Sequence, residues 1–314
     1  MLRKIANRLR AKLTPSGSYR FLIRNWSGMD DIELVSGMLG TETFRRILHS
    51  QPVPISTAKS IMVLAPHQDD ELIGAGGLCI KARKLGAKCA IVFLTDGAET
   101  GLGRQHGQHM PPEDVVKVRA IEAQAVCQRL GAEYLELGID NIGLATNIDH
   151  VDRLANIICT RQPDVLLVPW LMDGAPKHRM ANHLLWLANR RHLLKGFEVW
   201  GYQVNNSPLA NGILDITDEI DEKIELLKLY VSQNELLRRY DYQAWGLSAW
   251  NARFLPSKNL DPRAHFAELF CMLPLKEHLE LVERFYMKDF ERTYLGHTRV
   301  TASMSALHQK VTSA

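Results

Sequence analysis

Apolar and polar positions alternate through the middle of the chain in a pattern that predicts strands and helices in turn. Short apolar runs bounded by turn residues are typical of buried strands, and they lie at 60–65, 88–95, 133–137, 164–168 and 197–204. Segments with helical spacing separate them, at about 71–85, 112–131, 148–161 and 178–191. Strands alternating with helices predict an α/β fold with an open, mostly parallel sheet whose two faces are covered by helices.

The ends of the chain follow other patterns. Residues 2–13 place Leu2, Ile5, Leu9 and Leu13 at helical spacing with basic residues between them, which predicts a short basic amphipathic helix. Such a helix either docks on the protein's own surface or makes peripheral contact with an anionic membrane. We expect an N-terminal extension over 1–58 with one or two short helices, a main α/β domain over 59–290, and a tail over 291–314.

Beyond residue 205 the pattern predicts mainly helices. Thr217, followed by Asp218 and Glu219, is expected to open a long helix that runs to about residue 237. Loops and two or three further helices are expected to about residue 288. The residues after 297 are small and polar, and they predict a tail that is disordered at its end.

Composition narrows the class of protein. The 314 residues are 46% hydrophobic and 23% charged, as in ordinary globular proteins. The net charge is +3, but residues 1–29 hold seven basic and no acidic residues, so the remainder is mildly acidic and argues against nucleic-acid binding. The five cysteines form no Cys-x-x-Cys pair, and no apolar run approaches the about 20 residues of a membrane span. We therefore expect a cytoplasmic protein, with contact at the inner membrane surface through residues 2–13 as the second interpretation.

The strongest chemical signal is His67-Gln68-Asp69-Asp70, which follows the first predicted strand directly. Two adjacent carboxylates and an imidazole are costly at the end of a buried strand, because like charges repel and burial disfavours ionised groups. A divalent cation resolves both problems. Catalytic zinc sites use His and Asp ligands, three from the protein, and keep one position open to water. His67 and Asp70 are three residues apart in a turn leading into a helix, so both can reach one ion.

The remaining parts of such a site are expected on the same rim of the sheet. Asp69 can lie beside the metal-bound water and take its proton, because zinc lowers the pKa of that water to about 7. In open α/β sheets, ligands bind outside the carboxyl ends of the strands. Asp96 and His178 each follow a predicted strand there, and His178 is the best third ligand. His183, five residues on along a helix, is expected to point to a different face.

At these residues the sequence resembles the PIG-L/LmbE-type zinc N-deacetylases, over roughly residues 60–270. Residues 65–71 (APHQDDE) are similar to the family's AHPDDE segment, residues 94–99 (LTDGAE) to its TDG segment, and residues 176–179 (PKHR) stand where the family has HPDHR. Weaker similarities include Asp140 and Gly201-Tyr202-Gln203. The resemblance implies a Rossmann-like fold and one Zn²⁺ per chain.

The resemblance also assigns roles residue by residue. It implies that His67, Asp70 and His178 bind the zinc and that Asp69 is the general base. The implied reaction is hydrolysis of an N-acetyl group from an amino sugar, which gives acetate and a free amine. Contact with the substrate is expected from four further residues: Asp96, Asp140, Lys177 and Tyr202.

Two departures from the family pattern affect the chemistry. The first His of the family's second motif is Ala175 here, and its Asp, which would support the zinc-binding His, is Lys177. Loss of such a support typically weakens metal binding or activity 10–100-fold. Asp173 can replace that partner, and Lys177 can stabilise an oxyanion. The proton for the leaving amine can come from His106, His109, His183 or Asp69 itself, and the sequence leaves these open.

We therefore expect an enzyme that removes an N-acetyl group from an amino sugar or glycoconjugate, in surface glycan or glycolipid biosynthesis. The alternatives are a catalytically impaired sugar- or metal-binding protein on the same fold, and a metal-dependent hydrolase of another amide. Arg119 and Glu122 are spaced for an intrahelical ion pair, with a substrate role as the other interpretation. The aromatic residues of 240–250 are expected to pack in the core or in loops, or to stack on a sugar face. The sequence leaves the oligomeric state open.

Overall fold

The structure is a computed structural model that describes residues 32–46, 50–98, 110–234, 239–256 and 263–313. The basic segment 2–13 lies outside these residues, as do His106 and His109, so the predictions made for them stay predictions. Among the described helices, none combines the length and the apolar character needed to cross a membrane.

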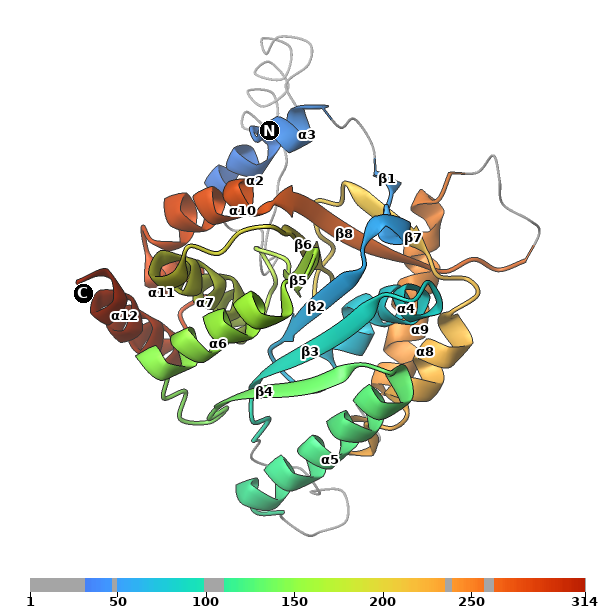
Figure 1. Cartoon of the computed structure of the whole chain (residues 1–314), viewed down its shortest axis with the longest axis horizontal. Helices are drawn as coiled ribbons and strands as arrows, with labels where there is room; N and C mark the ends of the chain where they lie inside the picture. The colour runs from blue at the N-terminus through green and yellow to red at the C-terminus, as the bar shows by residue number, and fades with distance from the viewer. Residues whose placement is uncertain (1–31, 47–49, 99–109, 235–238, 257–262, 314) are drawn as a thin grey trace, which may run out of the picture.

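The described strands and helices alternate through the central part of the chain (Figure 1). The strands are β1 (Gln51–Pro52), β2 (Ser60–Ala65), β3 (Lys88–Thr95), β4 (Glu133–Ile139), β5 (Val165–Pro169), β6 (Glu198–Tyr202), β7 (Gly212–Asp215) and β8 (Ala267–Pro274). The α-helices are α2 (Ile32–Leu39), α3 (Glu42–Arg46), α4 (Asp70–Lys84), α5 (Pro112–Leu130), α6 (Ile148–Arg161), α7 (Pro176–His192), α8 (Ile220–Leu227), α9 (Tyr240–Asn251), α10 (Leu275–Leu281), α11 (Phe290–Thr293) and α12 (Thr298–Thr312).

The strands form one 8-stranded sheet in the order β1-β7-β8-β6-β5-β2-β3-β4. The pairs among β4, β3, β2, β5 and β6 are parallel, and β8 runs antiparallel to both β6 and β7. The prediction of an open, mostly parallel sheet flanked by helices is therefore confirmed.

Alternate side chains of the central strands fill two separate cores. Met62 and Leu64 of β2 pack on the side of α6, α7, α10 and α12, whereas Ile61 and Val63 pack on the side of α4, α5, α8 and α9. Figure 1 shows these two groups of helices on opposite sides of the sheet. A strand buried on both faces must be apolar throughout, which is why β2 reads as a continuous apolar run.

The C-terminal part differs from the sequence prediction in one helix and in two strands. The expected long helix from Thr217 to about 237 is wrong, because α8 covers only Ile220–Leu227. The chain turns there so that the hydroxyl of buried Tyr230 donates a hydrogen bond of 2.6 Å to Glu71. Strands β7 and β8, expected as loops or helices, complete the sheet beside β6.

The tail is also more ordered than the sequence pattern predicts. Residues 298–312 form helix α12, and a buried stripe of four residues joins it to the core beside α7: Val300, Met304, Leu307 and Val311. Their spacing is that of one face of a helix, which the many Ser, Thr and Ala residues between them obscure.

Two glycines let α4 approach the sheet closely. A Cβ atom on Gly74 would lie 2.3 Å from the ring of Tyr202, and one on Gly77 would lie 2.5 Å from Ile216. A Cβ atom cannot be accommodated at such distances without moving the neighbouring element. The glycine-rich stretch after the His67 motif thus serves packing, and it fixes the position of α4, whose first residue is Asp70.

A buried ion pair ties α4 to the C-terminal elements. Lys223 of α8 and Glu268 of β8 are buried, with Nζ 2.8 Å from Oε1. The Glu268 carboxylate also accepts hydrogen bonds of 2.8 Å from the backbone N–H groups of Gly77 and Leu78, and Lys223 donates to the Ile73 carbonyl at 2.9 Å. Removing one partner of such a pair leaves an uncompensated buried charge.

We therefore expect Glu268→Gln to lower the free energy of unfolding by about 3–5 kcal/mol. The matched control is Glu280→Gln, because Glu280 pairs with Lys276 at 3.9 Å on the surface, where both side chains are exposed. That change should cost less than about 1 kcal/mol. Denaturant unfolding of both variants measures the difference, and equal losses would contradict the structural importance of the buried pair.

Candidate metal centre and its cavity

The site lies where the strand order reverses. From β2 the chain passes through α4 to β3 on one side, and β5 lies on the other side of β2. Such a reversal opens a crevice at the carboxyl ends of the two strands. His67 follows β2 directly, and His178 lies in the first turn of α7, which follows β5. Residues 111 positions apart in the sequence therefore meet at one point of the rim.

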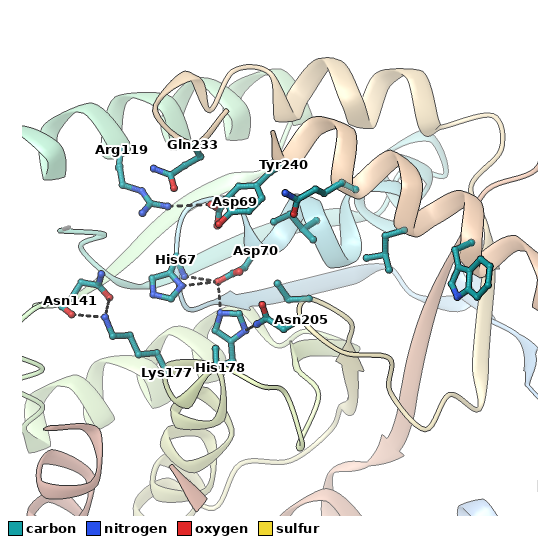
Figure 2. Close-up of a pocket in the computed structure, with 17 residues that line it drawn as sticks. His67, Asp69, Asp70, Arg119, Asn141, Lys177, His178, Asn205, Gln233 and Tyr240 are labelled. Carbon is teal, nitrogen blue, oxygen red and sulfur yellow. Dashed lines mark hydrogen bonds and ion pairs between the residues drawn. The ribbon is translucent and has the colours of Figure 1, made fainter. Parts of the chain in front are cut away.

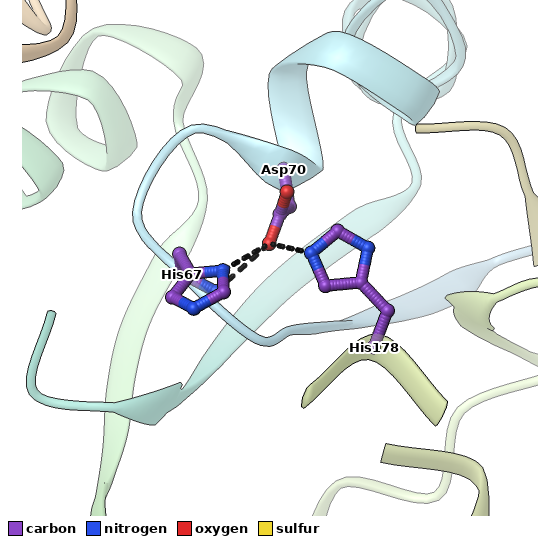
Figure 3. A group of neighbouring side chains, drawn as sticks. All are labelled: His67, Asp70 and His178. Atoms are coloured by element: carbon purple, nitrogen blue, oxygen red, sulfur yellow. Dashed lines mark hydrogen bonds and ion pairs between the residues drawn. The ribbon is translucent and has the colours of Figure 1, made fainter. Parts of the chain in front are cut away.

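The structure brings His67, Asp70 and His178 together. Their donor atoms all lie within 4.8 Å of one another. One oxygen of Asp70 lies 3.2 Å from His67 Nδ1 and 3.4 Å from His178 Nε2 (Figure 3). The Asp70 and His178 side chains are each 4% exposed, whereas that of His67 is 21% exposed and reaches the cavity described below.

The charges of this cluster favour a cation between the three side chains. Burial by itself raises the pKa of Asp70, but His178 and His67 outweigh it and hold that pKa at about 2. Burial by itself lowers the pKa of His178, but Asp70 and Asp173 outweigh it and raise that pKa to about 9. Burial lowers the pKa of His67, so this imidazole is neutral at pH 7. Two nitrogens and a carboxylate oxygen in this arrangement fit a divalent cation such as zinc.

Asp173 orients the second imidazole. Its buried carboxylate lies 3.0 Å from His178 Nδ1, which leaves Nε2 to face Asp70. Asp173 is itself held by hydrogen bonds from the Ala175 backbone and from the backbone and side chain of Asn205. A carboxylate on the far nitrogen of a metal-binding His fixes the ring and raises its basicity. Asp173 thus lies where the sequence analysis expected a replacement for the acidic residue lost at Lys177.

Asp69 faces the same cavity under strain. Its φ of 144° lies in a region that side-chain-bearing residues rarely adopt. Arg119 of α5 donates to the Gln68 carbonyl at 2.7 Å and lies 3.4 Å from the Asp69 carboxylate, and Glu71 accepts from the Asp69 N–H at 3.0 Å. These contacts hold the turn in place, and Figure 2 shows the one between Arg119 and Asp69. Burial raises the pKa of Asp69 well above its usual value, although Arg119 opposes the effect.

The cluster opens into a cavity of about 1020 Å³. Around the cluster its lining is polar and includes Arg119, Asn141, Lys177, Asn205 and Gln233. The other wall of the cavity comes mainly from α9, through Tyr240, Gln243, Ala244, Leu247 and Trp250. Ile73 of α4 and Val204 of the loop after β6 complete this wall. Of the aromatic residues considered for stacking on a sugar, Tyr240 and Trp250 line this cavity.

The four residues expected to contact the substrate lie in different places. Lys177 lines the cavity, and its Nζ donates to the carbonyl and side-chain oxygens of Asn141 at 2.6 and 2.8 Å. Asp96 accepts hydrogen bonds from the backbones of Ala98 and Asn141, so it shapes the loop that carries Asn141. Neither of these two hydrogen bonds involves a side chain of the metal cluster.

Asp140 and Tyr202 lie away from the described lining of the cavity. The exposed carboxylate of Asp140 accepts from the Ile142 N–H at 2.8 Å and caps the turn. Tyr202 is fully buried, and its hydroxyl donates to the Leu64 carbonyl at 2.9 Å. Their contacts are those of a turn cap and of core packing.

Other side chains considered in the sequence analysis are also placed. His183 is on a different face of α7, as expected, where it lies 2.5 Å from the Tyr294 hydroxyl and 3.2 Å from His308. Glu122 accepts hydrogen bonds from the backbone and hydroxyl of Ser232. Asn141, Asn205 and Gln233 line the cavity but were not predicted as site residues, because a single amide side chain carries no spacing signal. Asn141 and Asn205 lie in loops, and Gln233 ends a short 3-10 helix.

Fold and site together define an α/β protein with a candidate cation centre of two His and one Asp at the switch point of its sheet. The model of the PIG-L family, described as GlcNAc-PI de-N-acetylase, matches residues 62–189. Over these residues the chain matches the PIG-L family model, so the resemblance seen in the sequence is confirmed there. The deacetylases among the similar proteins are hydrolases that act on amide bonds.

Known proteins similar to this chain include deacetylases. The diacetylchitobiose deacetylase of Thermococcus kodakarensis is 26% identical over 198 residues, which cover 57% of this chain and 72% of that protein. The structure of the N,N'-diacetylchitobiose deacetylase of Pyrococcus horikoshii has a TM-score of 0.59 at 21% identity, and covers 78% of this chain and 94% of that chain.

A solved structure with a different reaction shares the fold. GalB, the 4-carboxy-2-hydroxymuconate hydratase of Pseudomonas putida, has a TM-score of 0.58 at 22% identity, and covers 68% of this chain and 95% of that chain. The fold alone therefore does not determine the reaction, which must be argued from the residues of the site.

The position of Asp173 leads to a prediction about metal affinity. We expect Asp173→Asn to raise the dissociation constant for a divalent cation by about 10–100-fold, because the His178 ring loses its carboxylate partner. Competition titration with zinc measures the change. Asp164→Asn is the matched control, since Asp164 also accepts backbone hydrogen bonds beside β5, from Lys59 and Ser60, but is exposed and does not contact the cluster. Equal affinities in the two variants would show that Asp173 does not support the metal site.

Proposed function

We propose that this protein is a zinc-dependent N-deacetylase that hydrolyses the N-acetyl group of an amino sugar or glycoconjugate. The observation that carries the proposal is the convergence of His67, Asp70 and His178 around one point, with Asp69 beside them at the wall of a cavity large enough for a sugar. The similarity to diacetylchitobiose deacetylases supports the substrate class.

The residues present fit the metal. His67, Asp70 and His178 would hold the ion, and Asp173 would keep the His178 ring in the orientation that presents Nε2. When bound there, a zinc ion supplies a Lewis acid for the amide carbonyl and lowers the pKa of a bound water to about 7.

Asp69 performs the proton transfers in this proposal. It accepts a proton from the attacking water, and the new bond forms between the water oxygen and the acetyl carbon. When the C–N bond breaks, Asp69 returns this proton to the amine nitrogen, so a free amine and acetic acid form. The acid then loses the second proton of the water to the solvent and leaves as acetate. Arg119 keeps the carboxylate in position through its contacts with Asp69 and the Gln68 carbonyl. His183 lies on another face of α7 and takes no part.

A second candidate is a catalytically impaired binding protein on the same fold. Ala175 and Lys177, which replace a His and an Asp of the family pattern, favour it. Asp173 already supports His178 from another position, and a shuttle through Asp69 needs no second His, so we favour the enzyme. The surface glycan or glycolipid pathway and the cytoplasmic location remain part of the proposal.

The division of roles predicts different outcomes for two substitutions. Asp69→Asn should retain one zinc per chain and lose about 100-fold or more in kcat, because general-base catalysis typically contributes 10²–10⁴-fold. His178→Ala should lose the zinc. Metal content and acetate release from N-acetylglucosamine and N,N'-diacetylchitobiose measure both effects.

The matched control for the histidine is His192→Ala, at the other end of α7, where His192 pairs with Asp152 on the surface. It should keep both zinc and activity. Equal zinc loss in Asp69→Asn and His178→Ala would refute the division of roles. A zinc-loaded wild-type chain that releases no acetate from a wide panel of N-acetyl sugars would favour the binding protein.

A further inference from the structure

Two histidines that take no part in the proposed reaction meet between α7 and α12. His183 of α7 is buried, and its Nε2 lies 3.2 Å from Nδ1 of half-buried His308 of α12. His183 Nδ1 lies 2.5 Å from the hydroxyl of buried Tyr294, which follows α11. Trp186 stacks on the His308 ring at 5.4 Å between centroids, and Phe290 lies 5.3 and 5.2 Å from the two imidazoles. Three polar groups in a row therefore join three elements inside an aromatic cluster.

The hydrogen bonds of this row fix where its protons lie. Tyr294 and His183 form no other side-chain hydrogen bond in the described part of the chain. When both imidazoles are neutral, one arrangement gives each buried hydrogen an acceptor. In it the Tyr294 hydroxyl donates to His183 Nδ1, and His183 donates from Nε2 to His308 Nδ1.

Protonation of His308 disrupts this arrangement. An imidazolium carries hydrogen on both nitrogens, so His308 Nδ1 becomes a donor to His183 Nε2. The His183 proton must then be on Nδ1, where it faces the Tyr294 oxygen, and the Tyr294 hydroxyl loses its acceptor. Because this hydroxyl is buried, the loss shifts the equilibrium between docked and undocked α12 by about tenfold or more.

The surroundings supply no negative charge to compensate an imidazolium. Helices α7 and α12 contain no acidic residue. Burial, and then His308, lowers the pKa of His183 to about 3. Burial, and then Arg190 of α7, lowers the pKa of His308. Asp289 and Glu291, the acidic residues at α11, affect neither pKa.

These lowered pKa values determine the direction of the pH effect. A His whose pKa is lowered in the docked state binds its proton more readily when the helix is undocked. Docking of α12 is therefore strongest above about pH 6.5, the ordinary pKa of His. It weakens as the pH falls from there towards the lowered pKa of His308.

Helix α12 also supports a wall of the main cavity. The Ser303 hydroxyl donates to the Leu144 carbonyl, and Arg299 donates to the Ile142 carbonyl at 3.2 Å. Leu144 and Ile142 belong to the turn after β4, which carries Asn141 into the lining of the cavity. Undocking of α12 removes both contacts, so this turn loses its support.

We propose that His183, His308 and Tyr294 form a pH-sensitive contact through which acidification weakens the docking of α12. The undocked helix no longer holds the turn that carries Asn141, and the wall of the main cavity loosens. The docking itself is independent of the function proposed above, whereas its effect on activity rests on that function.

Hydrogen exchange of the zinc-loaded full chain tests the proposal at about pH 7.5 and about pH 5, on either side of the ordinary pKa of His. Protection factors, which correct for the effect of pH on intrinsic exchange, should fall at least about tenfold in α12 at the lower pH. Those of α5 should not, because this helix contains no His and packs on the opposite face of the sheet. Unchanged protection of α12 would overturn the proposal.

The variant His308→Gln isolates the histidine, because Gln can accept from His183 Nε2 but takes up no proton. The acid loss of protection should disappear in it. His192→Gln, on the surface of α7, is the matched control and should keep the loss. His297→Asn is a second control, since His297 Nδ1 accepts from the Val300 N–H at the start of α12 and also loses this bond on protonation. A loss that persists in His308→Gln, or disappears in either control, would contradict the role of His308.

The titration of His308 in the wild type needs no variant. Its midpoint, read from the NMR shifts of the imidazole ring protons, should coincide with the midpoint of the loss of protection in α12. Two separate midpoints would show that another group controls the docking.

Activity separates this contact from the deacetylase function. On acidification, His308→Gln should keep a larger share of its kcat/KM than the wild type, and equal shares would overturn the effect on the cavity wall. If no N-acetyl sugar releases acetate but α12 loses protection in acid as expected, the contact stands and the deacetylase function fails. If acetate is released and α12 keeps its protection in acid, the function stands and the contact fails.

Discussion

The contact of one buried Asp70 oxygen with two imidazoles is the constraint on which the rest of the site depends. A carboxylate with so little access to solvent needs positive charge or hydrogen-bond donors close by. His67 comes from the end of β2, and His178 comes from the start of α7, so this need can be met only when β2 and β5 are neighbours. The electrostatics of a single oxygen thus depend on the pairing of the sheet.

Much of the site could be predicted because its signal is local. His67, Asp69 and Asp70 lie within four residues of one another, directly after a strand that the apolar run identifies. His178 was predicted as a ligand because parallel strands present their carboxyl ends on one rim. Asp173 was predicted as its partner because Lys177 stands where the family pattern has an acidic residue. The wall formed by α9 could not be predicted, since nothing in residues 240–251 indicates which elements they pack against.

The fold was predicted well where strands and helices alternate and poorly where the topology is not local. The eight residues of β8 have the length of an ordinary strand, but their place between β6 and β7 depends on pairings with residues about 50–75 positions earlier. The helix expected after Thr217 ends at Leu227, because the chain turns there and the Tyr230 hydroxyl donates a hydrogen bond to Glu71, next to Asp70. In both cases tertiary packing overrides a local pattern, which sequence periodicity alone does not reveal.

The position of β8 has a consequence for how the protein is made. The parallel strands β2 to β6 are complete by residue 202, yet β6 keeps an unpaired edge until residues 267–274 have been synthesised. A nascent chain leaving the ribosome therefore exposes an apolar strand edge for the time needed to add about 70 residues, which is several seconds at typical rates of translation. During that interval the edge can pair with another chain. Chaperone cover during translation would protect the edge until β8 closes it.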